Sequence, residues 1–266
     1  GVAAVPVSGG AETELRGDRV VLAAGALATS QIYLQTLAAG GRSGVELPGL
    51  MDNRQAMIPF LTPRLAGRAV ALASYQFHMV ALGLRGADGR SDVHGQISTL
   101  KAASVHPIVS GLPFNLRTSI EIFRRLRAGL GVANIWLPDS RRSANVVRLE
   151  GKGTGPSRLV LDYADHDRDL PAAREAIRRV RQALGELGCV APARMARLLP
   201  RGSSVHYAGT LPMGTEDREH TTRADGSVRG IPGLHVVDGA GFPWLPAKNL
   251  TFTLMANAAR IAAAMD

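Results

Sequence analysis

Two polar residues near the end of the chain could handle a proton during catalysis. His206 opens the string His206-Tyr207-Ala208-Gly209-Thr210-Leu211-Pro212-Met213-Gly214, in which Gly209 and Gly214 allow tight turns, and Asn249 precedes the apolar segment 251–265. An imidazole titrates near neutral pH, so His206 could act as an acid or a base, although a lone histidine is more often structural. The carboxamide of Asn249 could hydrogen-bond a hydroxyl or a carbonyl, and it could equally cap the helix that follows.

A third polar residue ends a short apolar strand pattern. Asp238 follows the run 234–237 and precedes Gly239-Ala240-Gly241. A carboxylate at the end of a strand, beside small residues, is well placed to accept a hydrogen bond from a ribose-type hydroxyl. An aspartate that merely closes a turn explains the same pattern.

The elements that must position these residues are visible in the hydrophobic patterns. The apolar run Val20–Ala24 stops at Gly25 and leads into a helical pattern at 28–38, which is typical of a strand-turn-helix unit in a doubly wound sheet. The run Val2–Val7, the turn Ser8-Gly9-Gly10 and a polar return strand predict extended structure before it. Residues 251–265 are apolar on nearly all sides, which predicts a buried helix. Its first N–H groups would form a site of partial positive charge.

The middle of the chain predicts a mixed sheet and one long helix. Prolines interrupt short apolar runs between residues 45 and 120. Two β-prone runs at 145–149 and 158–163, separated by a glycine-rich connection, indicate a hairpin. Apolar residues then recur at steps of three and four over 170–187, with Gly188 after them, which predicts an amphipathic helix.

Composition excludes several classes of protein. The 266 residues carry a net charge of +9, but few aromatic side chains accompany the arginine clusters, which are best interpreted as solvated helix faces, so we expect no nucleic-acid partner. The single cysteine excludes an internal disulfide and is compatible with a cytoplasmic location. We expect no membrane span, because no long apolar run is present. We also expect no metal, because the spacing of the other histidines demands none: His78, His94, His106, His166, His220 and His235.

Taken together, the strings around residues 206, 238 and 249 resemble the carboxy-terminal signature of the glucose-methanol-choline (GMC) flavoprotein oxidoreductases, which oxidise alcohols with FAD. The resemblance implies that His206 accepts the hydroxyl proton of a small-molecule alcohol and that Asn249 orients its oxygen. The departures are Leu250 where proline is usual and Gly241 in place of serine. The resemblance also implies a set of cofactor-binding residues: Gly25, Asp238, Gly239, Ala240, Asn249, Thr251 and Phe252.

The resemblance implies an α/β (α+β) fold in three segments. Residues 1–45 would be part of an FAD-binding Rossmann-like domain, 46–200 a mixed-sheet substrate-binding domain, and 201–266 the return to the first domain with the active-site residues. No Gly-x-Gly-x-x-Gly fingerprint is present, so the amino-terminal dinucleotide-binding unit is lacking. We therefore expect a fragment or a split chain whose partner is that missing FAD-binding half.

Two other functions fit part of the pattern. A non-catalytic α/β remnant, or a binding module with a basic surface, would need no catalytic pair. A nicotinamide-dependent dehydrogenase is disfavoured, because it would require its own dinucleotide loop.

Overall fold

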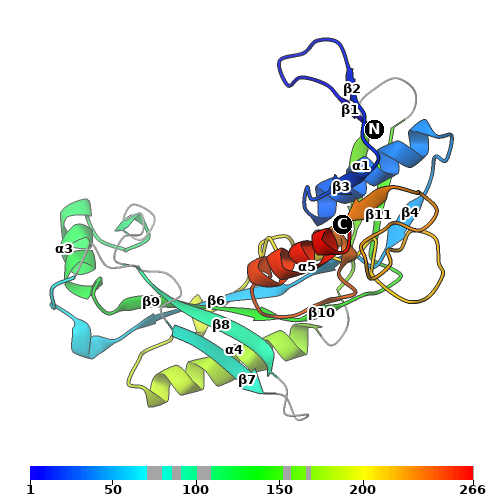
Figure 1. The fold of residues 1–266 in the computed structure, drawn as a ribbon. Coiled ribbons are helices and arrows are strands. Elements are labelled where there is room, and N and C mark those ends of the chain that lie inside the picture. The colour runs from blue at the N-terminus through cyan, green and yellow to red at the C-terminus, as the bar shows by residue number, and fades with distance from the viewer. Residues whose placement is uncertain (71–79, 86–90, 101–108, 152–156, 166–168, 266) are drawn as a thin grey trace. The chain divides into compact units, whose positions relative to one another are not determined.

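The computed structural model describes residues 1–70, 80–85, 91–100, 109–151, 157–165 and 169–265, which form two compact units (Figure 1). Unit 1 comprises Gly1–Asp52, Asp139–Asp165 and Val205–Asp266, and unit 2 comprises Asn53–Pro138 and His166–Ser204. The domain limits expected from the sequence group 139–165 with the central segment, whereas their contacts place them in unit 1.

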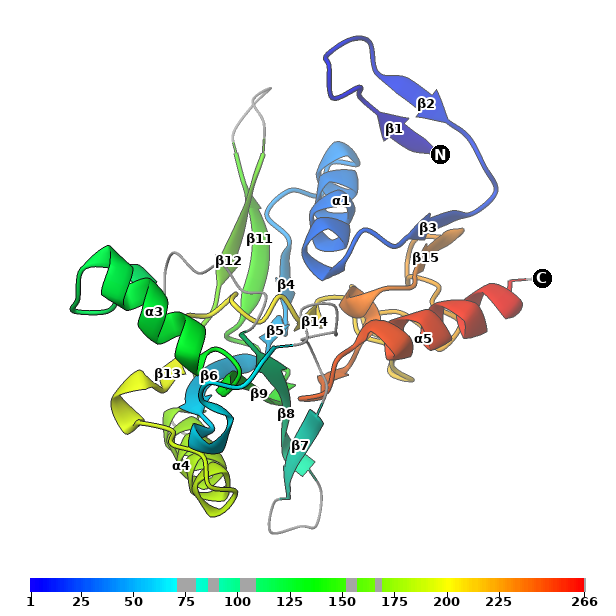
Figure 2. The same ribbon diagram turned by 90° about the vertical axis from the view of Figure 1, so that its left-hand side faces the viewer.

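Unit 1 contains several small sheets instead of one continuous sheet. Strand β15 (Leu234–Val236) runs parallel to β3 (Val20–Leu22), and helix α1 (Ala26–Ala39) follows β3, as Figure 2 shows. The remaining strands pair in antiparallel fashion: β1 (Val2–Ala4) with β2 (Thr13–Leu15), β5 (Met51–Asp52) with β14 (Tyr207–Ala208), β10 (Asp139–Ser140) with β16 (Trp244–Leu245), and β11 (Val146–Glu150) with both β4 (Glu46–Pro48) and β12 (Arg158–Asp162).

The predicted strand-turn-helix unit is confirmed at β3 and α1. Gly25 stands between them with φ +90° and ψ 152°, a conformation that is essentially restricted to glycine. The inner side of α1 buries Tyr33, Leu34 and Leu37 in a core that also contains Leu22 and Val236 of the parallel strands. The predicted hairpin is confirmed as well, because β11 and β12 pair in register from Val146 to Glu150. Its glycine-rich connection, 152–156, lies outside the described residues.

Unit 2 is an antiparallel sheet with a helix packed on it. The strand order is β13-β6-β9-β8-β7, with β6 at Arg54–Leu61, β7 at Val80–Arg85, β8 at Ser91–Thr99, β9 at Leu130–Leu137 and β13 at Arg197–Leu198. Helix α4 (Asp169–Glu186) buries Ala173, Ala176, Val180 and Leu184 against this sheet. Burial of this stripe confirms the predicted helix, and Gly188, just after its end at Glu186, has φ +75°.

Two further helices in the described residues are α3 (Leu116–Leu126) in unit 2 and α5 (Thr251–Ala263) in unit 1, and short 3-10 turns occur at Pro63–Leu65 (η1), Ala193–Met195 (η2) and Gly239–Gly241 (η3). The expectation of a buried final helix is wrong for this structure. In α5 only Ile261 is fully buried, whereas Phe252 and Met255 are 84% and 61% exposed. An apolar composition on all sides permits burial, but unit 1 packs against only part of the helix surface. Among the described residues, no helix is both long and apolar enough to cross a bilayer.

Candidate active site

The backbone that carries His206 is fixed by a short pair of strands. His206 directly precedes β14, in which Tyr207 stands opposite Asp52 of β5. Met51 and Ala208 on these strands are fully buried in a small core with Leu245 and Leu250. The residue before the histidine, Val205, has φ +52°, which is unusual for a β-branched side chain. The backbone on both sides of His206 is therefore held in place, by the unusual φ of Val205 before it and by the packed strand β14 after it.

The turn after His206 requires a glycine. Gly209 has φ +85°, and a Cβ there would lie 2.1 Å from the carbonyl oxygen of Gly49. Its N–H donates to the carbonyl of Gly239 at 3.1 Å, which ties this turn to the segment after β15. Gly214, by contrast, has no positive φ and no close neighbour at its Cβ position.

Burial and a nearby carboxylate act on His206 in opposite directions. Burial lowers the pKa of His206 below its ordinary value, and the charge of Asp52 partly offsets that effect. Burial raises the pKa of the Tyr207 hydroxyl, and the charge of Asp52 makes a smaller contribution in the same direction. Burial therefore favours the neutral imidazole, which is the form that can accept a proton.

A buried network holds the strand that bears Asp52. The N–H of Asp52 donates to Oδ2 of Asp139 at 2.9 Å, and Asp52 is only 3% exposed. Asp139 also accepts hydrogen bonds from Arg142, at 3.2 Å, and from the hydroxyl of Tyr163. Because a charged group with several partners cannot move independently, Asp139 fixes the position of β5 beside β14.

Asp238 joins two segments that lie far apart in the chain. Its Oδ2 accepts hydrogen bonds from the N–H of Gly25, at 2.8 Å, and from the hydroxyl of Thr29. Its Oδ1 accepts from the N–H of Ala240 at 2.9 Å, which is the turn contact expected of an aspartate after a strand. The carboxylate thus connects the start of α1 to the end of β15, and it still has lone pairs that could face a ligand.

The start of α5 differs from the expected asparagine cap. Leu250 occupies the position before the first helical residue, the structure shows no side-chain hydrogen bond there, and Asn249 is exposed. The first N–H groups of α5 have no partner within the helix, as at any helix start. Thr251 opens the helix, so these donors and the positive end of the helix dipole lie next to its side chain.

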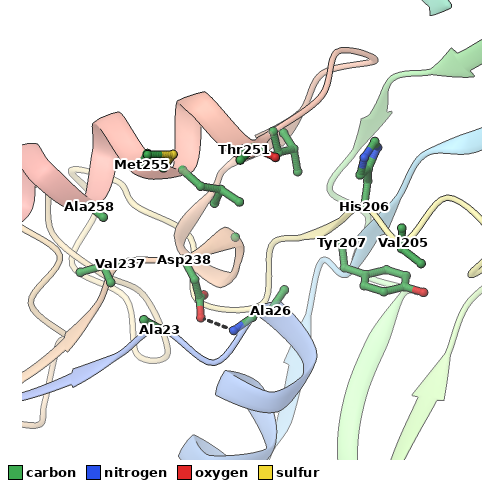
Figure 3. Close-up of a pocket in the computed structure, with 14 residues that line it drawn as sticks. Ala23, Ala26, Val205, His206, Tyr207, Val237, Asp238, Thr251, Met255 and Ala258 are labelled. Atoms are coloured by element: carbon green, nitrogen blue, oxygen red, sulfur yellow. Dashed lines mark hydrogen bonds between the residues drawn. The ribbon is translucent and has the colours of Figure 1, made fainter. Parts of the chain in front are cut away.

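These elements surround a cavity of about 470 Å³ in unit 1. Figure 3 shows α5 running along it, Asp238 facing the start of α1 at Ala26, and His206 on the segment before β14. Its lining comprises Ala23, Gly25, Ala26, Val205, His206, Tyr207, Val237, Asp238, Gly239, Leu250, Thr251, Leu254, Met255 and Ala258. The volume is in the range of small-molecule and cofactor pockets.

The cavity includes five of the residues predicted from the sequence: Gly25, His206, Asp238, Gly239 and Thr251. Asn249 is not among the lining residues, but Leu250 and Thr251, which follow it directly, are. Ala240 is fully buried and Phe252 is exposed, and neither lines the cavity. Their roles, and the catalytic role of Asn249, stay predictions.

Sequence reasoning missed the apolar wall of the cavity. Leu254, Met255 and Ala258 follow Thr251 at steps of three, four and seven, which place all four residues on one face of α5. That spacing could have identified the wall once Thr251 was assigned to a site. Val205 and Tyr207 flank His206 and could have been named for that reason alone.

The part of the chain that the structure describes contains no group of three or more His, Cys, Asp or Glu side chains that could hold a metal ion. His78, His106 and His166 lie outside the described residues. His220 instead shares a hydrogen bond with the buried hydroxyl of Tyr33 at 2.9 Å.

Comparison with known proteins finds a family model that matches part of the chain. Residues 141–258 match the model of a family described as GMC oxidoreductase. Two curated relatives are C-glycoside 3-oxidases. That of Arthrobacter globiformis is 38% identical over 101 residues, covering 38% of this chain and 18% of the relative, and that of Microbacterium trichothecenolyticum is 34% identical over 112 residues, covering 41% and 21%. The aligned regions thus span about a fifth of these relatives.

Solved structures extend the similarity of fold to nearly the whole chain. A pyridoxine 4-oxidase from Mesorbium loti matches 98% of this chain with a TM-score of 0.61 and 18% identity, and a formate oxidase matches 100% with a TM-score of 0.66 and 14% identity. An FAD-dependent oxidoreductase from Chaetomium thermophilum matches 99%, with a TM-score of 0.56 and 17% identity. This chain covers 53%, 57% and 58% of those structures, respectively, or just over half of each.

Proposed function

We propose that this chain is the carboxy-terminal portion of a GMC oxidoreductase and that it supplies the proton-accepting side of an FAD-dependent enzyme that oxidises an alcohol. The observation that carries the proposal is the position of His206 in the wall of a cavity that also contains the start of α5. The family, together with solved relatives that include an FAD-dependent oxidoreductase, supports FAD as the cofactor.

The residues around the cavity fit a flat, partly apolar cofactor. Gly25 and Gly239 line it without side chains, and a Cβ at Gly25 would meet no protein atom within 4 Å, so a side chain there would occupy space in the cavity. Leu254 and Met255 offer an apolar surface on the α5 side. The first N–H groups of α5 suit a ring edge on which negative charge develops. Gly25, Asp238, Gly239 and Thr251 are therefore the residues that would hold FAD.

The chemistry divides between the cofactor and the protein. FAD, when bound, supplies the acceptor for the hydride that leaves the alcohol carbon. His206 accepts the proton of the alcohol hydroxyl on an imidazole nitrogen, so that the C–OH group becomes a carbonyl. Asp52 lies close enough for its charge to favour the resulting imidazolium. Asn249 is proposed to orient the alcohol oxygen through its carboxamide.

The substrate is proposed to be a small molecule with a CH–OH group. Both curated relatives named above are called C-glycoside 3-oxidases, which favours a sugar-derived alcohol over a purely aliphatic one. The glycine-rich fingerprint that holds a dinucleotide pyrophosphate does not occur in the sequence. We propose that an amino-terminal FAD-binding part completes the site.

The proposal can be tested by absorbance spectroscopy of the full-length protein under anaerobic conditions. Purified protein should show an oxidised-flavin spectrum, and this absorbance should bleach when a substrate alcohol from a panel of sugars, glycosides and simple alcohols is added. Failure to retain flavin after reconstitution with FAD would contradict the proposal. It would favour the alternative of a non-catalytic α/β module.

A further inference from the structure

One end of unit 2 carries a group of exposed arginines beside two exposed apolar side chains. We call this group the basic surface and define it as Arg68, Phe114, Leu116, Arg117, Arg124 and Arg125. All six residues are exposed, with Phe114 at 55% and Leu116 at 69%. The last five lie on or just before α3, which is labelled and drawn in green in Figure 1.

Local contacts hold the parts of the basic surface together. The N–H of Gly67 donates to the carbonyl of Arg125 at 2.6 Å, which joins the segment that bears Arg68 to the last turn of α3. At the other end, Asn115 caps α3 by accepting a hydrogen bond from the N–H of Thr118 at 3.0 Å. Phe114 and Leu116 flank Asn115, so a hydrogen-bonded helix cap lies between these two exposed side chains.

The opposite side of α3 already supplies the packing that the helix needs. Phe123 and Ser119 are buried at 3% and 1% exposure, respectively. The exposed apolar side chains therefore do not belong to the core contact of this helix. A large apolar pair beside a charged surface is a common sign of an interaction site.

The charge of this region is strongly unbalanced. Within 53–70 and 109–130 the only acidic residue is Glu121, whose carboxylate lies 4.0 Å from Arg117. Of the seven arginines in these ranges, Arg54 lies at the far end of β6, and six lie toward α3: Arg64, Arg68, Arg117, Arg124, Arg125 and Arg127. Helix α4 is different, because its four arginines are accompanied by three acidic residues, and Arg178 lies 2.6 Å from Glu175. The excess positive charge is thus local to the α3 end.

We propose that the basic surface docks on an anionic lipid bilayer. Phe114 and Leu116 enter the interfacial region, and the arginines lie at the level of the negatively charged headgroups, which is how amphipathic segments bind membranes without crossing them. This proposal is independent of the proposed oxidoreductase activity. Nucleic acid fits less well, because an exposed leucine and a single aromatic ring offer little base stacking.

Sedimentation with unilamellar vesicles tests the proposal in the full-length protein. We expect binding to vesicles of phosphatidylcholine with 30% phosphatidylglycerol, and at least about tenfold weaker binding to phosphatidylcholine alone, because headgroup charge provides much of the attraction. Binding should also weaken as salt rises from about 50 to about 300 mM. Absence of binding to the anionic vesicles at low salt would overturn the proposal.

Two variants separate the contributions of charge and apolar contact. Arg124→Gln with Arg125→Gln, and separately Phe114→Ser with Leu116→Ser, should each reduce vesicle affinity at least about fivefold. Because all four side chains are exposed, the variants should keep the circular dichroism spectrum of the parent.

A matched control removes the same charge from α4. Arg178→Gln with Arg179→Gln should leave vesicle binding within about twofold of the parent, because these arginines lie outside the basic surface. Equal loss in the control would show that net charge alone drives binding, and it would overturn the proposal. Binding to a short DNA duplex with the same dependence on Arg124 and Arg125, without vesicle binding, would also overturn it.

Discussion

The backbone N–H of Gly25 donates a hydrogen bond to the carboxylate of Asp238 at 2.8 Å, although 213 positions separate the two residues. This contact joins the turn between β3 and α1 to the end of β15, and both residues line the cavity. One buried carboxylate therefore connects the end of the parallel strand β15 to the turn before α1 in the cavity lining.

Asp238→Asn should reduce the free energy of unfolding by about 1–3 kcal/mol, because the N–H of Gly25 and the buried hydroxyl of Thr29 lose a charged acceptor. Asp225→Asn is the control, since Asp225 also accepts hydrogen bonds in a turn but is exposed. It should cost less than about 1 kcal/mol. Chemical denaturation measures both values. Equal losses in the two variants would show that the hydrogen bond from Gly25 adds nothing to the free energy of unfolding beyond an ordinary turn contact.

Gly25→Ala should reduce the flavin content of the full-length protein, because the new methyl group would enter the cavity. Gly41→Ala is a suitable control at the other end of α1, since Gly41 has φ +84° and a Cβ there would also meet nothing within 4 Å. Each change strains the backbone by about 1–3 kcal/mol. Only Gly25→Ala should lower the ratio of flavin to folded protein in the absorbance spectrum. A parallel loss in both variants would argue against a cofactor beside Gly25.

Asp52→Asn should move the acidic limb of the kcat/KM profile to lower pH. Burial already lowers the pKa of His206, so the limb of the parent enzyme should lie below about 6.5, the ordinary pKa of histidine. Asp52 opposes this effect by favouring the protonated imidazole, and its neutralisation lowers the pKa further. The exposed substitution Glu14→Gln should leave the profile unchanged. A shift of the limb to higher pH would contradict this electrostatic relationship.

Local patterns in the sequence were enough to predict several of the regular elements. The apolar run before Gly25, the two β-prone runs of β11 and β12, and the stripe of α4 each have a clear period, and the structure confirms them. Their pairing across the chain was harder to predict. Neither the division of β strands among small sheets nor the inclusion of 139–165 in unit 1 follows from local periodicity, because both depend on contacts between distant segments.

The candidate site was predictable where a residue type has a specific chemical use. His206 and Asp238 were named from their types and neighbours and Gly25 from the family resemblance, and all three line one cavity. The apolar wall at Leu254, Met255 and Ala258 was missed because such residues look like any helix core. The burial of α5 was overestimated for the same reason: composition indicates which surfaces can be buried and does not show what covers them.

The central claim is that His206 accepts the proton of the alcohol, and steady-state turnover of a His206→Ala variant in the full-length protein tests it most directly. We predict a fall in kcat of about 10²–10⁴-fold, the usual contribution of a general base, with the flavin content unchanged. His235→Ala, which changes a histidine that does not line the cavity, should keep most of the activity. Turnover of His206→Ala within a few-fold of the parent enzyme would contradict the account.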